Sequence, residues 1–364
     1  MKKNNHLIKT AAKPLIIPIF VMNSGCPHRC IFCNQKISAG NHPQKLNKEY
    51  FENEINSYLK WNKDKSRLVE IAFYGGSFTG IDKVYQEHLL SWAQSYLQAG
   101  LVNSIRVSTR PDYIDIGILA RLKKYGVTTV EIGAQSFIDD VLQFAQRGHN
   151  AADTIKAIRL LKENNFQTSL HLMAGLPKDT KDGFIFSVEK TMELKPDMVR
   201  IHPVVVFHDT ALAREFAEGS YQPLLLSEAV SLCAIAREKL ATAGIRVIRT
   251  GLHLTKEMEN NNTVLAGPLH PAFGSLVLAA MYYDKTRQLL EQIPSETREI
   301  SFKLHNSDIS SFRGPQNNNI AAIKKLYPQA VINVRTSPEQ KRGLISVTTT
   351  DQGGILTTAI SGIT

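Results

Sequence analysis

The chain has 364 residues, of which 43% are hydrophobic and 21% charged, so it can bury a large core and form more than one small domain. No segment approaches the roughly 18 apolar residues of a membrane span, and no apolar signal-peptide core opens the sequence. These features exclude the membrane and secreted classes, and we expect a cytoplasmic protein with reduced thiols. The formal net charge of +10 suits an anionic partner such as RNA, although a solvated basic surface is an equal alternative.

Short apolar segments alternate with longer helical patterns along most of the chain, which predicts parallel β/α units. The predicted strands cover residues 15–22, 68–76, 104–110, 128–136, 168–175 and 197–206, with a seventh at 245–250. Six or seven such units favour an α/β fold with a partial or complete β/α barrel resembling a TIM barrel. A cofactor would lie at the C-terminal ends of the strands.

The last third of the chain predicts a small α+β subdomain. It contains a helix near 272–292, a strand near 299–304, a helix near 316–326, and a hairpin of residues 330–336 with 343–350. We therefore expect a barrel over residues 1–252 and a C-terminal helix with the small subdomain over 253–364.

Successive side chains of a strand face opposite sides, so polar residues along these strands should share the barrel lumen. Val130, Ile132 and Ala134 would then face the helices. Burying polar groups without partners costs several kcal/mol each, so either a polar ligand or a closed network of ion pairs must satisfy them. The predicted lumen residues are Ser108, Arg110, Glu131, Gly133, Gln135, Ser169, His171, Met173, Arg200 and His202.

Three of the four cysteines, Cys26, Cys30 and Cys33, follow the first strand with the spacing C-x3-C-x2-C. Three clustered cysteines leave one unpaired in any disulfide scheme, and the distant Cys233 lies in an apolar helical segment typical of a core. Zinc normally has four ligands, and His28 is the local candidate for the fourth. A four-iron cluster held by three thiolates would instead leave one iron open to a ligand from outside the protein.

With Phe32 directly before the last cysteine, this motif resembles the signature of the radical S-adenosylmethionine (SAM) superfamily. The stretch "YGGSFTG" (74–80) resembles its glycine motif, with Ser77 where a glutamate is commoner. Other stretches resemble, in order, motifs of the Elongator catalytic-subunit-like branch and, more distantly, oxygen-independent coproporphyrinogen oxidase. They are "STRPD" (108–112), "EIGAQS" (131–136), "QRGH" (146–149), "HLMAGLP" (171–177), "KPDMVRIHPVVVFHDTAL" (195–212) and "LAGPLHPAFGSLV" (265–277).

The resemblance implies a radical SAM barrel in which Cys26, Cys30 and Cys33 hold a 4Fe-4S cluster. SAM would be reductively cleaved to a 5'-deoxyadenosyl radical that abstracts hydrogen from an unidentified substrate, with electrons from an external donor of the flavodoxin or ferredoxin type. Gln135 would contact the SAM ribose, Arg147 its carboxylate and Met173 its adenine, although Arg147 also suits a surface cation at a helix end. The implied cofactor-binding residues are Gly75, Gly76, Ser77, Gln135, Arg147 and Met173, and the candidates for orienting substrate or moving a proton are His171, His202 and His270.

The substrate stays open at this point. The relatives favour tRNA, a small molecule or tetrapyrrole is the alternative, and a non-catalytic RNA-binding protein with a structural metal loop is an alternative of another class. Neither acetyl transfer nor an auxiliary cluster is expected, because no R/Q-x-x-G-x-G/A loop follows the barrel and Cys233 is the only spare thiol. The first 70 residues carry 12 Lys or Arg against 5 Asp or Glu. Two basic sets could border the barrel mouth: Lys2, Lys3, Lys9 and Lys13, or Lys60, Lys63, Lys65 and Arg67.

Overall fold

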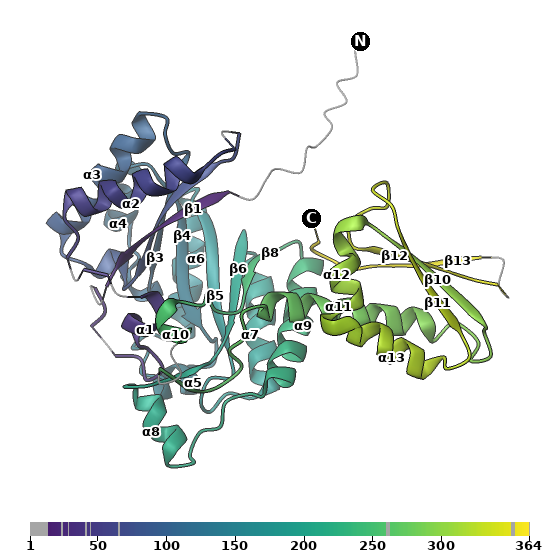
Figure 1. Cartoon of the computed structure of the whole chain (residues 1–364). Coiled ribbons are helices and arrows are strands. Elements are labelled where there is room, and N and C mark those ends of the chain that lie inside the picture. The colour runs from purple at the N-terminus through teal and green to yellow at the C-terminus, as the bar shows by residue number, and fades with distance from the viewer. Residues whose placement is uncertain are drawn as a thin grey trace, which may run out of the picture.

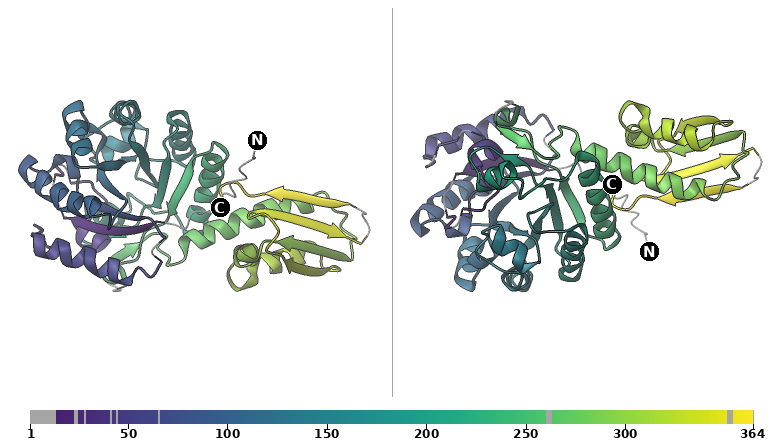
Figure 2. Two further views of the ribbon diagram at one scale, coloured as in Figure 1. Left: turned by 90° about the horizontal axis from the view of Figure 1, so that it is seen from above. Right: turned by 90° about the horizontal axis from the view of Figure 1, so that it is seen from below.

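A computed structural model describes residues 14–363 except 23, 24, 28, 41, 44, 65, 260–262 and 351–353. His28, Lys65 and the basic set at residues 2, 3, 9 and 13 therefore lie outside the described residues. Two units lie side by side, a larger α/β unit and a smaller C-terminal one, and helix α11 (Phe273–Leu290) runs from the first into the second (Figures 1 and 2). None of the helices in the described part of the chain is both long and apolar enough for a membrane crossing.

Seven parallel strands form the sheet of the larger unit in the order β1-β2-β3-β4-β5-β6-β8. Since β1 and β8 do not pair within the described residues, the barrel is partial. All seven predicted strands are confirmed, six of them to within one residue at each end. The strands are β1 (Leu15–Val21), β2 (Val69–Gly75), β3 (Ser104–Thr109), β4 (Val127–Gln135), β5 (Gln167–Ala174), β6 (Met198–Pro203) and β8 (Arg246–Thr250).

The sixth predicted strand is shorter than expected. It ends at Pro203, and the residues after it form β7 (Val206–Phe207), which pairs with β9 (Val264–Ala266) in a separate antiparallel ladder. The helices of the larger unit are α1 (Gln35–Ala39), α2 (Lys48–Trp61), α3 (Lys83–Gln98), α4 (Ile116–Lys124), α5 (Asp139–Phe144), α6 (Ala151–Glu163), α7 (Lys181–Leu194), α8 (Ala211–Ala217), α9 (Leu226–Thr242) and α10 (Lys256–Glu259).

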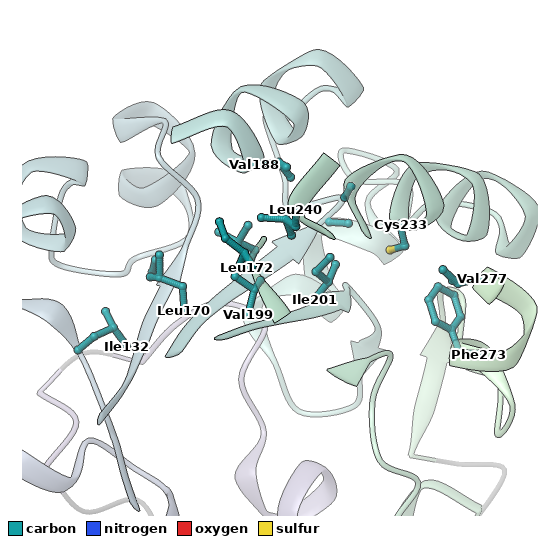
Figure 3. Packing of buried hydrophobic residues seen from close by; sticks show 14 of the residues in the cluster. Ile132, Leu170, Leu172, Val188, Val199, Ile201, Cys233, Leu240, Phe273 and Val277 are labelled. Carbon is teal, nitrogen blue, oxygen red and sulfur yellow. The ribbon is translucent and has the colours of Figure 1, made fainter. Parts of the chain in front are cut away.

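The main core lies between the outer face of the sheet and the helices that cover it. Figure 3 shows Leu172, Val199 and Ile201 from the strands beside Leu240 of α9 and Phe273 of α11. Such burial of large apolar side chains stabilises the fold by roughly 1.5–3 kcal/mol each. Cys233 lies in the same layer and is wholly buried, which confirms that it is a core residue.

The predicted alternation along β4 is also confirmed, and it places an ion-pair network in the lumen. Val130, Ile132 and Ala134 belong to the core, whereas Glu131 accepts a hydrogen bond from Arg200 Nη1 at 2.8 Å.

The network continues across two more strands. Arg106 Nη1 lies 3.7 Å from Glu131, and Arg106 Nε donates to Glu70 at 2.8 Å. The ion-pair network is therefore present in the N-terminal halves and middles of the strands, although Arg106 Nη1 and Glu131 Oε2 have no hydrogen-bond partner among the described residues. Other buried atoms without partners, such as Gln135 Oε1 and His202 Nε2, lie nearer the C-terminal ends.

The smaller unit has a four-stranded sheet in the order β11-β10-β12-β13. Its elements are β10 (Glu299–Leu304), α12 (Ile309–Arg313), α13 (Asn318–Leu326), β11 (Val331–Thr336), β12 (Leu344–Thr349) and β13 (Ile355–Ala359). The predicted hairpin of β11 with β12 is wrong, because β10 lies between them, parallel to β11 and antiparallel to β12. The division at residues 252 and 253 stays a prediction.

We predict that Glu131→Gln lowers the free energy of unfolding by roughly 3 to 5 kcal/mol, because it leaves two buried guanidiniums without their shared carboxylate. Burial alone would raise the pKa of Glu131, but Arg200 and Arg106 hold it below its ordinary value, so the lost side chain is an ionised one. Urea titration of the metal-free protein measures the change. Glu193→Gln breaks only an exposed pair with Lys190 and should shift the midpoint little; equal shifts for the two variants would contradict the prediction.

Candidate functional site

The three clustered cysteines lie on a loop between β1 and α1, at the C-terminal end of the sheet. Backbone bonds anchor this loop on both sides, since Ile31 N donates to Ala145 O at 3.3 Å and Leu212 N donates to Ile31 O at 2.8 Å. Asn34 Nδ2 adds a bond of 3.0 Å to His208 O. The loop is thus held between the end of α5 and the start of α8, and the cysteines open toward the barrel mouth.

The cysteine loop packs backbone against backbone on the glycine turn that follows β2. A Cβ atom on Gly25 would lie 2.1 Å from Ser77 O, and one on Gly80 would lie 2.3 Å from Gly25 O. Gly25 also has a φ of 70°, a conformation that favours glycine. The sequence interpretation did not single out these two glycines, although one directly precedes Cys26 and the other ends the glycine motif.

Gly75 and Ser77 of the glycine motif have different surroundings. Gly75 has a φ of 102° and approaches Val21 so closely that a Cβ would lie 2.8 Å from the Val21 carbonyl oxygen. The Ser77 hydroxyl is buried, lies 3.0 Å from Thr109 Oγ1 and accepts a bond from Arg110 N at 3.1 Å. Ser77 therefore ties the turn after β2 to the end of β3, and a contact with a ligand stays a prediction for it.

Arg147 and Gln135 lie beside the cysteine loop. Arg147 is 7% exposed, so it is not a surface cation. Its Nη1 donates to Cys30 Sγ at 3.1 Å and its Nη2 to Gly133 O at 2.7 Å. Gln135 has a φ of 70°, and its Oε1 and the Arg147 Nε are buried without a hydrogen-bond partner among the described residues. A strained backbone and unpartnered buried atoms together are typical of a ligand site.

His171 and His202 face the lumen with their ring centroids 4.3 Å apart, edge to face. Burial lowers the pKa of His171 to about 3, helped by Arg200, and burial with His171 lowers the pKa of His202 well below its ordinary value. Neutral imidazoles favour the orienting role over proton transfer near neutral pH. His270 is not part of this pair, since its Nδ1 accepts a bond from Ala272 N in its own turn. Met173 is nearly buried and packs with Ile31.

The basic set before the second strand does not lie at the mouth. Arg67 Nη2 donates to Pro14 O at 3.1 Å and Leu15 N donates to Leu68 O at 2.7 Å, which places this segment at the N-terminal ends of β1 and β2. The cysteine loop follows the other end of β1, roughly 20 Å away along a seven-residue strand. The hypothesis that Lys60, Lys63, Lys65 and Arg67 border the mouth is therefore wrong for its described members.

The three cysteines and the side chains next to them fit an iron-sulfur cluster with one open iron and a polar ligand beside it. Within the described ranges, no three His, Cys, Asp or Glu side chains converge on a single metal ion. A cluster needs no such convergence, because each thiolate binds its own iron. Desolvation and the neighbouring thiols raise the pKa of Cys33 to about 12, and bound metal favours the thiolate form. The unpartnered Gln135 and Arg147 atoms supply donors and acceptors for a polar ligand next to the loop.

Comparison with known proteins agrees with this geometry. A sequence profile described as the radical SAM superfamily matches residues 20–190, and one described as the radical SAM C-terminal domain matches residues 196–283. The chain belongs to the radical SAM superfamily and is a radical SAM enzyme, which excludes the non-catalytic alternative. The family implies a 4Fe-4S cluster and SAM as cofactors.

Within the superfamily, the chain is distantly homologous to Elongator complex protein 3 and the tRNA uridine(34) acetyltransferases. It is 28% identical over 275 residues to tRNA uridine(34) acetyltransferase of Methanocaldococcus jannaschii, covering 63% of this chain and 50% of that protein. Human Elongator complex protein 3 is 26% identical over 186 residues, covering 46% and 34%. The chain thus spans about half the length of the archaeal relative.

A solved structure of archaeal Elp3 from Methanocaldococcus infernus, lacking its N-terminus, shares the fold. Its TM-score is 0.56 at 19% identity, over 76% of this chain and 64% of that one.

We predict that Gly25→Ala lowers the iron bound after anaerobic reconstitution to under half, because its Cβ would push the cysteine loop away from the glycine turn. Gly100→Ala is the matched control, since Gly100 has a φ of 69° but nothing within 4 Å of the added atom. Iron analysis with far-UV circular dichroism separates loss of the loop from loss of the fold. Equal iron loss in both variants would point to backbone strain alone.

Proposed function

We propose that the protein holds a 4Fe-4S cluster through Cys26, Cys30 and Cys33 and binds SAM between the glycine turn and β4. When bound, these groups supply a 5'-deoxyadenosyl radical that abstracts hydrogen from the substrate. The observation that carries the proposal is the pair of buried, unpartnered atoms, Gln135 Oε1 and Arg147 Nε, beside the cysteine loop. An electron donor of the flavodoxin or ferredoxin type is part of the proposal, because the cluster must be reduced from outside.

The chain's own residues would position SAM. Arg147 would give a charge-assisted hydrogen bond to the SAM carboxylate, and the Gln135 amide suits a ribose hydroxyl as donor and acceptor. Gly75 and Gly76 belong to the turn proposed to contact the amino acid portion, and Met173 offers an apolar surface to the adenine. A Cβ on Gly133 would lie 3.0 Å from Gln135 Nε2, so this glycine lets the amide approach β4.

We propose tRNA as the substrate, by the likeness to relatives named for tRNA modification. Exposed basic side chains next to the cysteine loop support an anionic partner: Arg29 within the loop, Lys36 in α1 and Lys256 in α10. Helices α1 and α10 are joined by a bond of 2.7 Å from Thr255 Oγ1 to Ile37 O, so both lysines belong to one surface. A small molecule or tetrapyrrole is the alternative substrate.

The test of the proposed chemistry is anaerobic reconstitution followed by dithionite and SAM. The wild-type protein should bind roughly four irons and release 5'-deoxyadenosine. Cys33→Ala should lose both properties, whereas Cys233→Ala should keep both because Cys233 is a core residue. A single tightly bound zinc with no iron in the reconstituted wild-type protein would overturn the cluster assignment.

Arg147→Ala should weaken SAM binding by roughly 1.5–3 kcal/mol, the range for a hydrogen bond to a charged group, and Gln135→Ala by roughly 0.5–1.5 kcal/mol. Anaerobic calorimetry on preparations of equal iron content measures both values, since Arg147 also contacts Cys30. Arg159→Ala, on the exposed face of α6, is the control. An unchanged affinity for SAM in Arg147→Ala would remove Arg147 from the SAM site.

If tRNA binds at the mouth, its affinity should fall roughly a thousandfold between 50 and 200 mM salt when six or more phosphates are engaged. Replacing Arg29, Lys36 and Lys256 together by Gln should flatten the slope of log K against log salt by roughly 0.9 per lost contact. The Lys60→Gln/Lys63→Gln double variant removes the same kind of charge at the opposite end and should leave the slope unchanged. Undetectable tRNA binding at low salt would favour the small-molecule alternative.

A further inference from the structure

We infer that the lumen wall formed by β5, β6 and β8 binds an oxyanion of the substrate, a phosphate or a carboxylate, through Arg249 and the His171–His202 pair. This inference rests on the proposed function, because it assigns a substrate group to the same lumen. The residues proposed to bind the cluster, the SAM carboxylate and the SAM ribose do not lie on these three strands.

The first argument is a charge inventory of the lumen. Glu70 and Glu131 are neutralised by Arg106 and Arg200 within the ion-pair network. Arg249 of β8 is aligned with Arg200 of β6 in the sheet register, so it adds a third guanidinium to the same wall. It has no acidic side chain within 4 Å in the described part of the chain, and its Nε donates only to Gly251 O, at 3.3 Å.

Burial makes this excess charge costly. Arg249 is half-buried, and desolvation with repulsion from Arg200 lowers its pKa below the ordinary value for a guanidinium. A guanidinium presents five N–H donors in a planar fork that matches the oxygens of a phosphate or carboxylate. A bound oxyanion would offset the repulsion and receive the remaining donors.

The second argument is the pair of imidazoles next to it. His202 is 8% exposed, and its Nε2, like that of His171, is enclosed without a hydrogen-bond partner among the described residues. In the sheet register Arg249 is paired with Arg200, and His202 follows Arg200 by two residues on β6, so Arg249 and His202 belong to adjacent strands of the same wall. Buried polar atoms without a protein partner in a native fold call for a ligand or ordered water.

The position of Arg249 separates it from the residues proposed to contact the SAM ribose and carboxylate. Gln135 ends β4, and β8 lies three strands further along the sheet, a separation on the order of 14 Å at about 4.8 Å between neighbouring strands. Met173, the proposed adenine contact, is the register partner of His202, so a substrate anchored at Arg249 and the His171–His202 pair would meet SAM at its adenine side. Tyr74 of β2 reaches the same wall from across the sheet, since the Arg200 guanidinium lies 5.3 Å from its ring centroid.

The experiment measures ligand affinity by NMR titration of the reconstituted full chain with SAM bound. Uridine 5'-monophosphate, uridine and glutarate are the probes. We expect Arg249→Gln to lower the affinity for the monophosphate or for glutarate at least tenfold. Its affinity for uridine should equal that of the wild type. Arg246→Gln, on an exposed position of the same strand, should change none of them. Arg249→Lys keeps the charge but lacks the planar set of N–H donors, so its affinity for the anion should lie between those of the wild type and Arg249→Gln.

Binding of the monophosphate alone assigns the anion to a phosphate, as in RNA, and binding of glutarate alone assigns it to a carboxylate substrate. His202→Gln is an independent test that stays available if Arg249→Gln fails to fold. It should lower the affinity for the same anion. The inference is overturned if neither anion binds more tightly than uridine, or if both variants bind as the wild type does. Iron content and 5'-deoxyadenosine formation of the wild-type protein are measured on the same preparations, so failure of the proposed function is distinguished from failure of this inference.

Discussion

The buried network of Glu70, Arg106, Glu131 and Arg200 is the constraint on which the lumen depends. Each carboxylate is held by a guanidinium from another strand, so the network joins β2, β3, β4 and β6 across the inner face of the sheet. Ion pairs of this kind contribute little net stability compared with apolar packing, but removing one member is costly. The network therefore places fixed charge in the N-terminal part of the lumen up to the level of Arg200, and the proposed ligand residues lie at that level or nearer the C-terminal ends of the strands.

Above that network, the site is formed by close contacts between backbones. The cysteine loop can rest on the glycine turn only because Gly25 and Gly80 lack side chains. Ser77 fits the same arrangement, because its short hydroxyl lies within hydrogen-bond distance of Thr109 Oγ1 and accepts a bond from the backbone N–H of Arg110. A longer acidic side chain would need a different environment, so the turn in this chain is adapted to serine.

Much of this fold follows from local patterns in the sequence. The alternation in β4 predicted both the core face and the lumen face, because a strand with helices on one side and a polar lumen on the other must separate apolar from polar side chains. The same patterns do not identify which strands pair with each other. The predicted β11–β12 hairpin was therefore wrong, because β10 lies between these two strands in the sheet. The contact of Arg147 with Cys30 depends on loops 117 residues apart in sequence, which no local pattern reports. The place of Lys60 and Arg67 could have been inferred, since residues just before a strand lie at its N-terminal end.

The distribution of unpartnered groups divides the C-terminal half of the lumen into two sides. Gln135 and Arg147, each with an unpartnered buried atom, lie next to the cysteine loop, whereas His202, with an unpartnered Nε2, and Arg249, whose Nε donates to Gly251 O, lie on β6 and β8. A reaction that transfers a hydrogen atom requires the two reactants to be held in contact, with water excluded. The two proposed sites would meet that requirement, because Arg147 would hold SAM and Arg249 would hold the substrate, each at a charged end.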